Sequence, residues 1–205
     1  EIIKAGGQAV PCTDSVSTYA SANSIVETAV KTFGKIDIVV NNAGYTHKNQ
    51  PFLDVDEATY DRCFDVNVKA IYHMINAVVP MMRAKKSGCI INVGSTAGIR
   101  PRPGLTWYNA SKGAANLLSK SLAVELAGDN IRVNVICPVM GDTGMLGDFM
   151  GIPDTPENRA KFIATIPMGR LSVPRDIANA AVFLASEEAS FLTGLELPVD
   201  GGRTI

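Results

Sequence analysis

Short apolar runs alternate with longer helical patterns along almost the whole chain, and this alternation constrains the fold most. The runs are nearly continuous in Val, Ile and Leu, as strands are when helices cover both faces of a parallel sheet. The sequence therefore predicts an α/β protein with a doubly wound, Rossmann-like parallel sheet in three α/β/α layers. The expected strands are 9–12, 36–41, 89–93, 131–137 and 195–199, and the expected helices are 19–33, 56–86, 107–127 and 174–186.

Polar motifs follow several of these runs, where a parallel sheet binds its ligands at the carboxyl ends of the strands. The chain of 205 residues shows no repeat and no second domain, so 1–205 reads as a single domain. The stretch 138–156 is rich in Gly, Pro and Met, which predicts a long loop. We expect 138–168 to act as a lid over the substrate.

Composition excludes several classes of partner. With 46% hydrophobic residues, 19% charged residues and a net charge of −1, neither nucleic acid nor an anionic membrane is an expected partner. No apolar run is long enough to span a bilayer, and no signal peptide is visible, so a cytoplasmic protein is expected. The four cysteines are scattered and read as reduced and buried. His47 and His73 have no acidic or cysteine neighbours at ligand spacing, so no metal site is expected.

Tyr108 and Lys112 lie four residues apart in Trp-Tyr-Asn-Ala-Ser-Lys, thirteen and seventeen residues after Ser95. On a helix, positions four apart share a face, so the ammonium group would lie beside the phenol. A nearby positive charge lowers the pKa of a tyrosine from about 10 toward neutrality, which suits proton exchange with an alcohol. A Tyr-x-x-x-Lys pair alone is more often a solvated helix face.

Three further motifs strengthen the catalytic interpretation. Asn41-Asn42-Ala43-Gly44 ends one apolar run, Asn67 interrupts an apolar helical stretch, and Cys137-Pro138 ends another run with Thr143 five residues later. In order and spacing, these motifs resemble the classical short-chain dehydrogenase/reductase family from about residue 8 to Gly202. The resemblance implies hydride transfer between NAD or NADP and a secondary alcohol or ketone.

The resemblance also implies roles for four residues. Tyr108 would be the general acid/base, and Lys112 would lower its pKa and bind the nicotinamide ribose. Ser95 would position the substrate oxygen, with a turn serine as the alternative. Asn67 would kink its helix and hold a water in a relay to Lys112; a capping or core asparagine is the alternative.

Two segments would hold the cofactor if the resemblance holds. Asp14 would meet the adenine amino group, although a helix N-cap is an alternative for it. Where the family usually has Pro-Gly, this chain has Pro138 followed by Val139, and a β-branched residue resists positive φ. The nicotinamide turn is therefore expected to differ. The family's adenosine-ribose segment corresponds to Asn41, Ala43 and Gly44, for which an ordinary strand-to-helix turn is the alternative. Its carboxamide segment corresponds to Pro138, Gly141 and Thr143.

The lid and its surroundings are apolar, which predicts a pocket for an alicyclic, aromatic or acyl-chain ketone. The alternative is that half of these residues form the lid's own core. Four acidic and no basic side chains lie between Val139 and Asn158, which argues against a phosphate- or carboxylate-rich substrate. The nearest basic group is Lys85, Lys86, Arg100 and Arg102, which could bind an acidic carrier protein. Carrier-dependent reductases of the family tend to have a basic residue in the turn after the catalytic helix, where this chain has Gly128-Asp129-Asn130, so solvated surface is the more ordinary interpretation. The expected substrate contacts are Ser95, Trp107, Tyr108, Met145 and Phe149.

The glycine-rich turn with which this family holds the pyrophosphate has no counterpart in the sequence. We expect two strands and most of two helices to be missing at the N-terminus, together with the residue that distinguishes NAD from NADP. The run 9–12 would then lack a neighbour and leave an apolar edge open. The alternative function is an inactive fragment or a non-enzymatic member acting through its interfaces.

Apolar residues on more than one face of helices 56–86 and 107–127 suggest a second buried surface. Together with the resemblance, this predicts a homo-oligomer, most simply a tetramer. The alternative is that neighbouring helices of the same chain cover these faces.

Overall fold

The structure, a computed structural model, describes residues 1–205 and contains one parallel sheet of four strands. The order is β1-β2-β3-β4, and β2 pairs with β3 over the whole length of β2, from Gly88 opposite Ile131 to Val93 opposite Ile136. The predicted parallel sheet is confirmed. The strands are β1 (Ile38–Asn41), β2 (Gly88–Val93), β3 (Ile131–Pro138) and β4 (Glu196–Val199).

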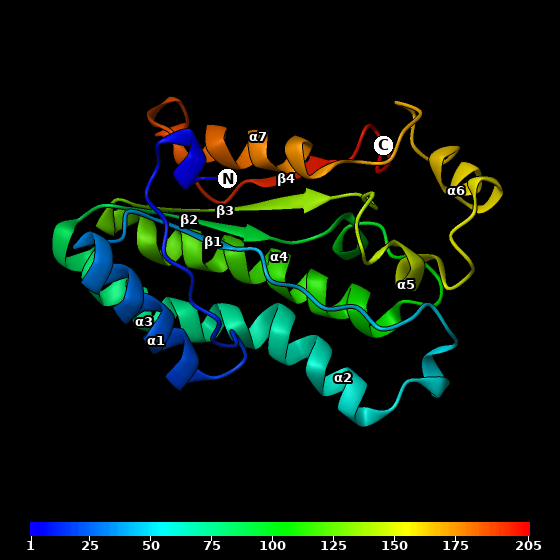
Figure 1. Ribbon diagram of the computed structural model, residues 1–205, viewed down its shortest axis with the longest axis horizontal. Helices are drawn as coiled ribbons and strands as arrows, with labels where there is room; N and C mark the ends of the chain where they lie inside the picture. Colours follow the sequence, from blue (N-terminus) through cyan, green and yellow to red (C-terminus); the bar gives the residue numbers. More distant parts are fainter.

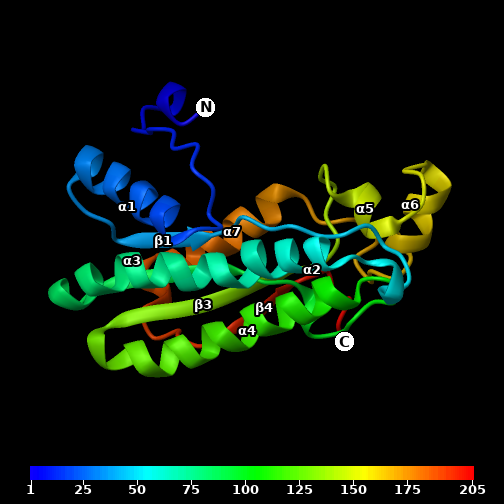
Figure 2. The ribbon, with the colours of Figure 1, turned by 90° about the horizontal axis from the view of Figure 1, so that it is seen from below.

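Helices cover both faces of the sheet, as expected for three layers (Figure 1). On one face lie α3 (Ala70–Lys85) and α4 (Thr106–Leu126), with α1 (Tyr19–Phe33) packed against α3 (Figure 2). On the other face lies α7 (Pro174–Ala185). Along β2, Ile90 enters the core of the first face, whereas Cys89 and Ile91 enter the core beneath α7. This alternation follows from the two-residue period of a strand.

Local capping sets the ends of α1. The backbone N–H of Ser21 donates to the Thr18 hydroxyl at 3.2 Å, and Gly34 ends the helix at a φ of 79°. These are the usual N-cap and C-cap residues, because the threonine oxygen satisfies a free donor and glycine adopts positive φ without strain. The helix predicted over 19–33 is confirmed.

The helix predicted over 56–86 contains a defect. It begins as α2 (Glu57–Phe64), where Asp56 accepts from the N–H of Thr59 at 2.7 Å, passes through a π-helical turn at Asp65–Lys69, and continues as α3. Asn67 lies buried in that turn. The expected kink at Asn67 is therefore a π turn, a form that is frequent at functional sites.

Two expectations about secondary structure were wrong. Residues 9–12 form no strand and are exposed, because no neighbouring strand offers them backbone partners. On the β1 side the sheet therefore ends at β1 itself. The loop expected over 138–156 contains a short helix, α5 (Leu146–Met150), and α6 (Pro156–Ile163) follows it. Thr155 caps α6 and Pro156 occupies its first turn. The 3₁₀ turns are Ile3–Ala5, Phe52–Asp54, Thr96–Gly98, Ala127–Asp129 and Glu187–Ala189.

The expectation for the cysteines is partly wrong. Cys63, Cys89 and Cys137 are buried, but Cys12 is exposed in the irregular segment before α1; all four are free thiols. None of the helices combines the length and the apolarity that a membrane crossing requires.

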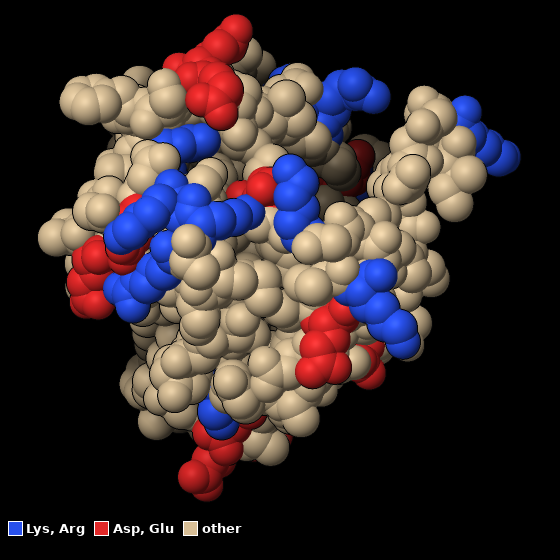
Figure 3. Space-filling model, turned by 90° about the vertical axis from the view of Figure 1, so that its left-hand side faces the viewer, with Lys and Arg blue, Asp and Glu red and all other residues tan.

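Lys85 and Lys86 lie at the end of the sheet where the strands begin, far along the strands from the polar motifs. Lys85 pairs with Asp37 at 2.7 Å, and Lys86 pairs with Asp129 at 2.5 Å. Figure 3 faces this end, where basic and acidic side chains lie side by side. The structure thus separates these lysines from Arg100 and Arg102, with which they appeared to group in the sequence.

Candidate active site

A cavity of about 800 Å³ lies at the carboxyl ends of the strands. The segment after β1 contributes Asn42, Ala43 and Gly44, and the segment after β2 contributes Ser95. The stretch from Pro138 to Met145 follows β3, and Tyr108 and Lys112 enter from α4. This is the location that a parallel α/β sheet favours for ligands.

Tyr108 lies near the start of α4 and is 5% exposed. Its ring packs with Ala97 and Leu105 and meets the edge of Phe149 at 5.2 Å between ring centroids. Burial raises the pKa of the Tyr108 phenol to about 12, and the Ser95 side chain partly opposes that rise. At neutral pH the phenol therefore holds its proton.

Lys112 lies one turn further along α4 and is 4% exposed. Its ammonium group donates to the carbonyl oxygen of Val93 at 2.8 Å and stands 6.0 Å from the centroid of the Tyr108 ring. Burial lowers the pKa of Lys112 to about 8. The pKa of Tyr108 is thus raised, not lowered as expected from the neighbouring Lys112, because desolvation of the phenol is the largest effect on it.

Ser95 begins the 3₁₀ turn Thr96–Gly98 and is buried. Its hydroxyl oxygen accepts from the backbone N–H of Ala97 at 3.0 Å. The hydroxyl hydrogen is left free to donate, since that bond uses only a lone pair. Ser95 is therefore both the turn serine of the alternative interpretation and a lining residue of the cavity.

Asn67 joins the π turn to two other segments. Its side-chain nitrogen donates to the carbonyl of Tyr45 at 2.8 Å and to the hydroxyl of Ser111 at 2.9 Å, and its oxygen accepts from the N–H of Tyr45 at 2.9 Å. A Cβ atom at Gly44 would lie 3.6 Å from both Asn67 Oδ1 and Lys112 Nζ. The amide thus fixes the segment after β1 against α4, beside the Lys112 ammonium group.

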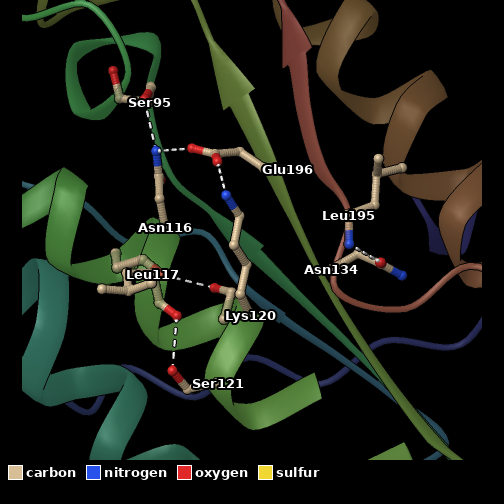
Figure 4. A network of polar contacts seen from close by, with 10 residues as sticks. Ser95, Asn116, Leu117, Lys120, Ser121, Asn134, Leu195 and Glu196 are labelled. Carbon is tan, nitrogen blue, oxygen red and sulfur yellow. Dashed lines mark hydrogen bonds and ion pairs between the residues drawn. The ribbon is translucent and has the colours of Figure 1, made fainter. Parts of the chain in front are cut away.

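A polar network behind Ser95 was not anticipated from the sequence (Figure 4). The side-chain nitrogen of Asn116 donates to the Ser95 carbonyl at 3.3 Å and to the Glu196 carboxylate at 2.8 Å, and Lys120 also binds that carboxylate. A Cβ atom at Gly94 would lie 2.0 Å from Asn116 Oδ1, so only glycine lets the asparagine lie this close. The network ties the Ser95 segment to α4 and β4.

The expected cofactor residues divide into two groups. Ala43, Gly44, Pro138, Gly141 and Thr143 line the cavity. Val139 lines it too, and its φ is not positive, since Lys86 and Asn130 are the only non-glycine residues with positive φ. Val139 thus lines the turn without the positive φ that a β-branched residue resists.

Asn41 and Asp14 are not brought to this cavity. Asn41 donates from its side-chain nitrogen to Asn92 Oδ1 at 2.8 Å and lines a second cavity of about 540 Å³ between α1 and β1. Asp14 is exposed, and its carboxylate accepts from the Cys12 thiol at 3.6 Å. It lies in the irregular segment that was expected to be a strand, so the sheet does not position it.

The expected substrate residues also divide. Met145 and Phe149 line the cavity with Ser95 and Tyr108. Trp107 does not, because consecutive helical residues point about 100° apart. Its indole N–H donates to the carbonyl of Phe52 at 3.2 Å, and its ring meets Tyr60 edge-on at 5.4 Å. Leu146 and Met150 are buried in a small core within the segment expected to act as a lid, as the alternative interpretation held for part of this segment.

Arg100, Arg102 and Arg203 also line the cavity, although none was predicted as a site residue. They come from the segment after Ser95 and from the C-terminus, so no local pattern groups them. The sequence did contain a signal for Asn116 and Glu196, two residues of the polar network behind Ser95. Asn116 is four residues after Lys112, and Glu196 is a lone charge in the apolar run Leu-Glu-Leu-Pro-Val.

Comparison with known proteins identifies the family. A family profile described as enoyl-(acyl carrier protein) reductase matches residues 1–204. The 4-formylbenzenesulfonate dehydrogenase TsaC1/TsaC2 of Comamonas testosteroni is 47% identical over 199 residues, which are 97% of this chain and 79% of that protein. The chain belongs to the classical short-chain dehydrogenase/reductase family.

Two further members of the short-chain dehydrogenase/reductase family support this assignment. Cyclopentanol dehydrogenase of Comamonas testosteroni is 37% identical over 204 residues, covering all of this chain and 80% of the enzyme. The crystal structure of 3-ketoacyl-(acyl-carrier-protein) reductase from Brucella melitensis complexed with NADH has a TM-score of 0.88 and 44% identity, over 94% of this chain and 77% of that chain. The expected oxidoreductase class and its nicotinamide cofactor, NAD or NADP, are thereby confirmed for the family.

Proposed function

We propose that the protein transfers a hydride between a nicotinamide cofactor and a secondary alcohol or ketone bound in the 800 Å³ cavity. The observation that carries this proposal is the meeting of Tyr108, Lys112 and Ser95 in one largely apolar cavity at the strand ends. A proton-holding phenol, a second hydroxyl and an ammonium group are the parts that carbonyl reduction needs.

The residues around Lys112 fit the sugar of a nicotinamide nucleotide. The ammonium group is buried with one hydrogen-bond acceptor, the Val93 carbonyl, so further donors remain for ribose hydroxyl groups. Gly44 presents no side chain beside that nitrogen, and Asn67 holds this backbone segment in place. When bound, the nicotinamide ring supplies or accepts the hydride.

The proton is handled by Tyr108. In reduction its phenol, which keeps its proton at neutral pH, donates that proton to the substrate oxygen as negative charge develops there. Ser95 donates its free hydroxyl hydrogen to the same oxygen. In oxidation the phenol must first lose its proton, and its burial makes that direction harder at neutral pH.

The walls of the cavity favour an apolar substrate body. Met140, Met145, Phe149, Phe162 and Ile177 contribute apolar surface on the side of the lid and α7. Such walls suit an alicyclic, aromatic or acyl group. The names of the similar proteins, which refer to a formylbenzenesulfonate and to cyclopentanol, agree with a ring as the substrate body.

Fluorescence titration with NADH and NADPH tests the proposal, followed by a panel of cyclic, aromatic and acyl-chain ketones. We expect saturable binding of at least one cofactor and turnover of at least one ketone class. The Tyr108→Phe variant is the matched control, because it should bind cofactor without turnover. Absence of binding by both cofactors would leave the second candidate, a non-enzymatic family member acting through its interfaces.

A further inference from the structure

The charged side chains that line the cavity all carry positive charge. They are Arg100, Arg102, Lys112 and Arg203, and no aspartate or glutamate lines the cavity. Of the four acidic residues between Val139 and Asn158, Asp142 and Asp154 pair with Arg159 at 3.0 and 2.5 Å, outside the cavity. The lid therefore does not make the cavity acidic, contrary to the expectation from its sequence.

The three arginines lack acidic partners. None of them forms an ion pair with an aspartate or glutamate, and Arg100 donates instead to the backbone carbonyl of Arg203 at 3.0 Å. Side-chain packing holds Arg102, whose guanidinium lies 4.8 Å from the centroid of the Phe162 ring and reaches the sulfur of Met140 at 3.9 Å. Burial, and then the charge of Arg203, lower the pKa of Arg102. The cavity thus holds a cation without a counter-ion.

We propose that Arg102, with Arg100 and Arg203 beside it, binds an anionic group on the substrate. This inference rests on the proposed function and names its substrate class: an aromatic or alicyclic alcohol or ketone with a sulfonate or carboxylate away from the reacting oxygen. A planar guanidinium matches two oxygens of such a group with two parallel N–H···O bonds. The contact with the Phe162 ring fixes the plane of the guanidinium group before the substrate binds.

The arrangement also explains how one cavity accepts a ring and a charge together. Phe149 packs against Tyr108, where the reacting oxygen must lie, and Phe162 packs against Arg102. A ring between these two aromatic side chains would extend from the proton donor toward the guanidinium group. A phosphate of the cofactor is the other anion that could occupy this position, and the experiment below separates the two.

The experiment compares 1-phenylethanol with its 4-carboxylate and 4-sulfonate derivatives, which share a reacting centre. We expect the ratio of kcat/KM for the anionic and neutral alcohols to fall roughly 10- to 100-fold in Arg102→Met, as loss of a charge-assisted pair predicts. Arg102→Lys should recover part of that ratio. Arg175→Met, which removes an exposed arginine outside the cavity, should leave the ratio unchanged.

Three results would overturn the anion site. The first is an equal ratio in wild type and Arg102→Met, and the second is a fall in cofactor affinity in Arg102→Met with no change in the ratio. Calorimetric titration with benzenesulfonate and benzoate, against benzyl alcohol as the neutral ligand, measures binding without turnover. Anion binding that depends on Arg102, in a protein that oxidises none of the alcohols, would uphold the site and refute hydride transfer. The third result is turnover of 1-phenylethanol without preferential anion binding. It would refute the anion site and uphold hydride transfer.

Discussion

Lys112 lies one helical turn from Tyr108 on the same face of α4, yet its ammonium group bonds to the Val93 carbonyl rather than to the phenol. Both side chains are buried without an ion-pair partner. Burial therefore moves the two pKa values apart, up to about 12 for Tyr108 and down to about 8 for Lys112. The pair is tuned by desolvation more than by mutual attraction.

Tyr108→Phe should abolish most turnover while cofactor binding survives, because only the hydroxyl group is removed. General acid/base catalysis contributes about 10²- to 10⁴-fold, so kcat should fall by that factor. Steady-state kinetics and the nicotinamide fluorescence titration measure the two quantities. A loss of kcat smaller than tenfold would contradict the role assigned to this phenol.

Lys112→Met should make the protein more stable at pH 7. Removing a buried charge relieves its desolvation, partly offset by the lost bond to Val93, for a net gain of about 1–3 kcal/mol. Urea unfolding of the two proteins gives the difference in the free energy of unfolding.

The difference in the free energy of unfolding between Lys112→Met and the wild-type protein should shrink as pH rises from about 8 to 10.5. In this window the unfolded chain keeps the lysine proton and the folded chain releases it, so the wild-type protein gains stability with pH. A difference that stays constant from pH 7 to 11 would show that the folded-state pKa is not lowered.

Asn116→Leu should lower kcat about tenfold by releasing the Ser95 segment, with little change in cofactor affinity. In a Ser95→Ala background the same substitution should have almost no further effect on kcat, since Asn116 acts through Ser95. Ser121→Ala, which removes a hydroxyl on the exposed side of α4, is the control. Additive losses in the double variant would assign Asn116 a purely structural role.

The protein should form a homo-oligomer through α4, most simply a tetramer. Most of the apolar second face is covered within the chain, but Leu117 and Val124 remain 65% and 81% exposed, seven residues apart on one side of the helix. Light scattering at micromolar concentration should give a multiple of the chain mass, and Leu117→Glu together with Val124→Glu should reduce it. A monomer mass for the unchanged protein would refute the oligomer.

Local sequence signals predicted helix α1 better than they predicted the absence of a strand at 9–12 or the grouping of charged side chains in the cavity. Thr18 and Gly34 fix the ends of α1 with atoms a few residues away, so its sequence suffices. The run 9–12 has a strand-like composition, but a strand also needs a partner that no local pattern supplies. The grouping of Arg102 with Arg203 likewise depends on two segments about a hundred residues apart.

The π turn at Asp65–Lys69 makes the register of α3 depend on one surplus residue. The wide turn takes up this residue, so deleting one residue there would restore a regular α-helix while the residues after the turn keep their direction relative to α2. Val78 and Met82 would then still face the sheet, whereas the wide turn that holds Asn67 against Tyr45 and Ser111 would be lost. One deletion would thus change the polar site and leave the packing of the core in place, which separates the contribution of Asn67 from that of the helix that carries it.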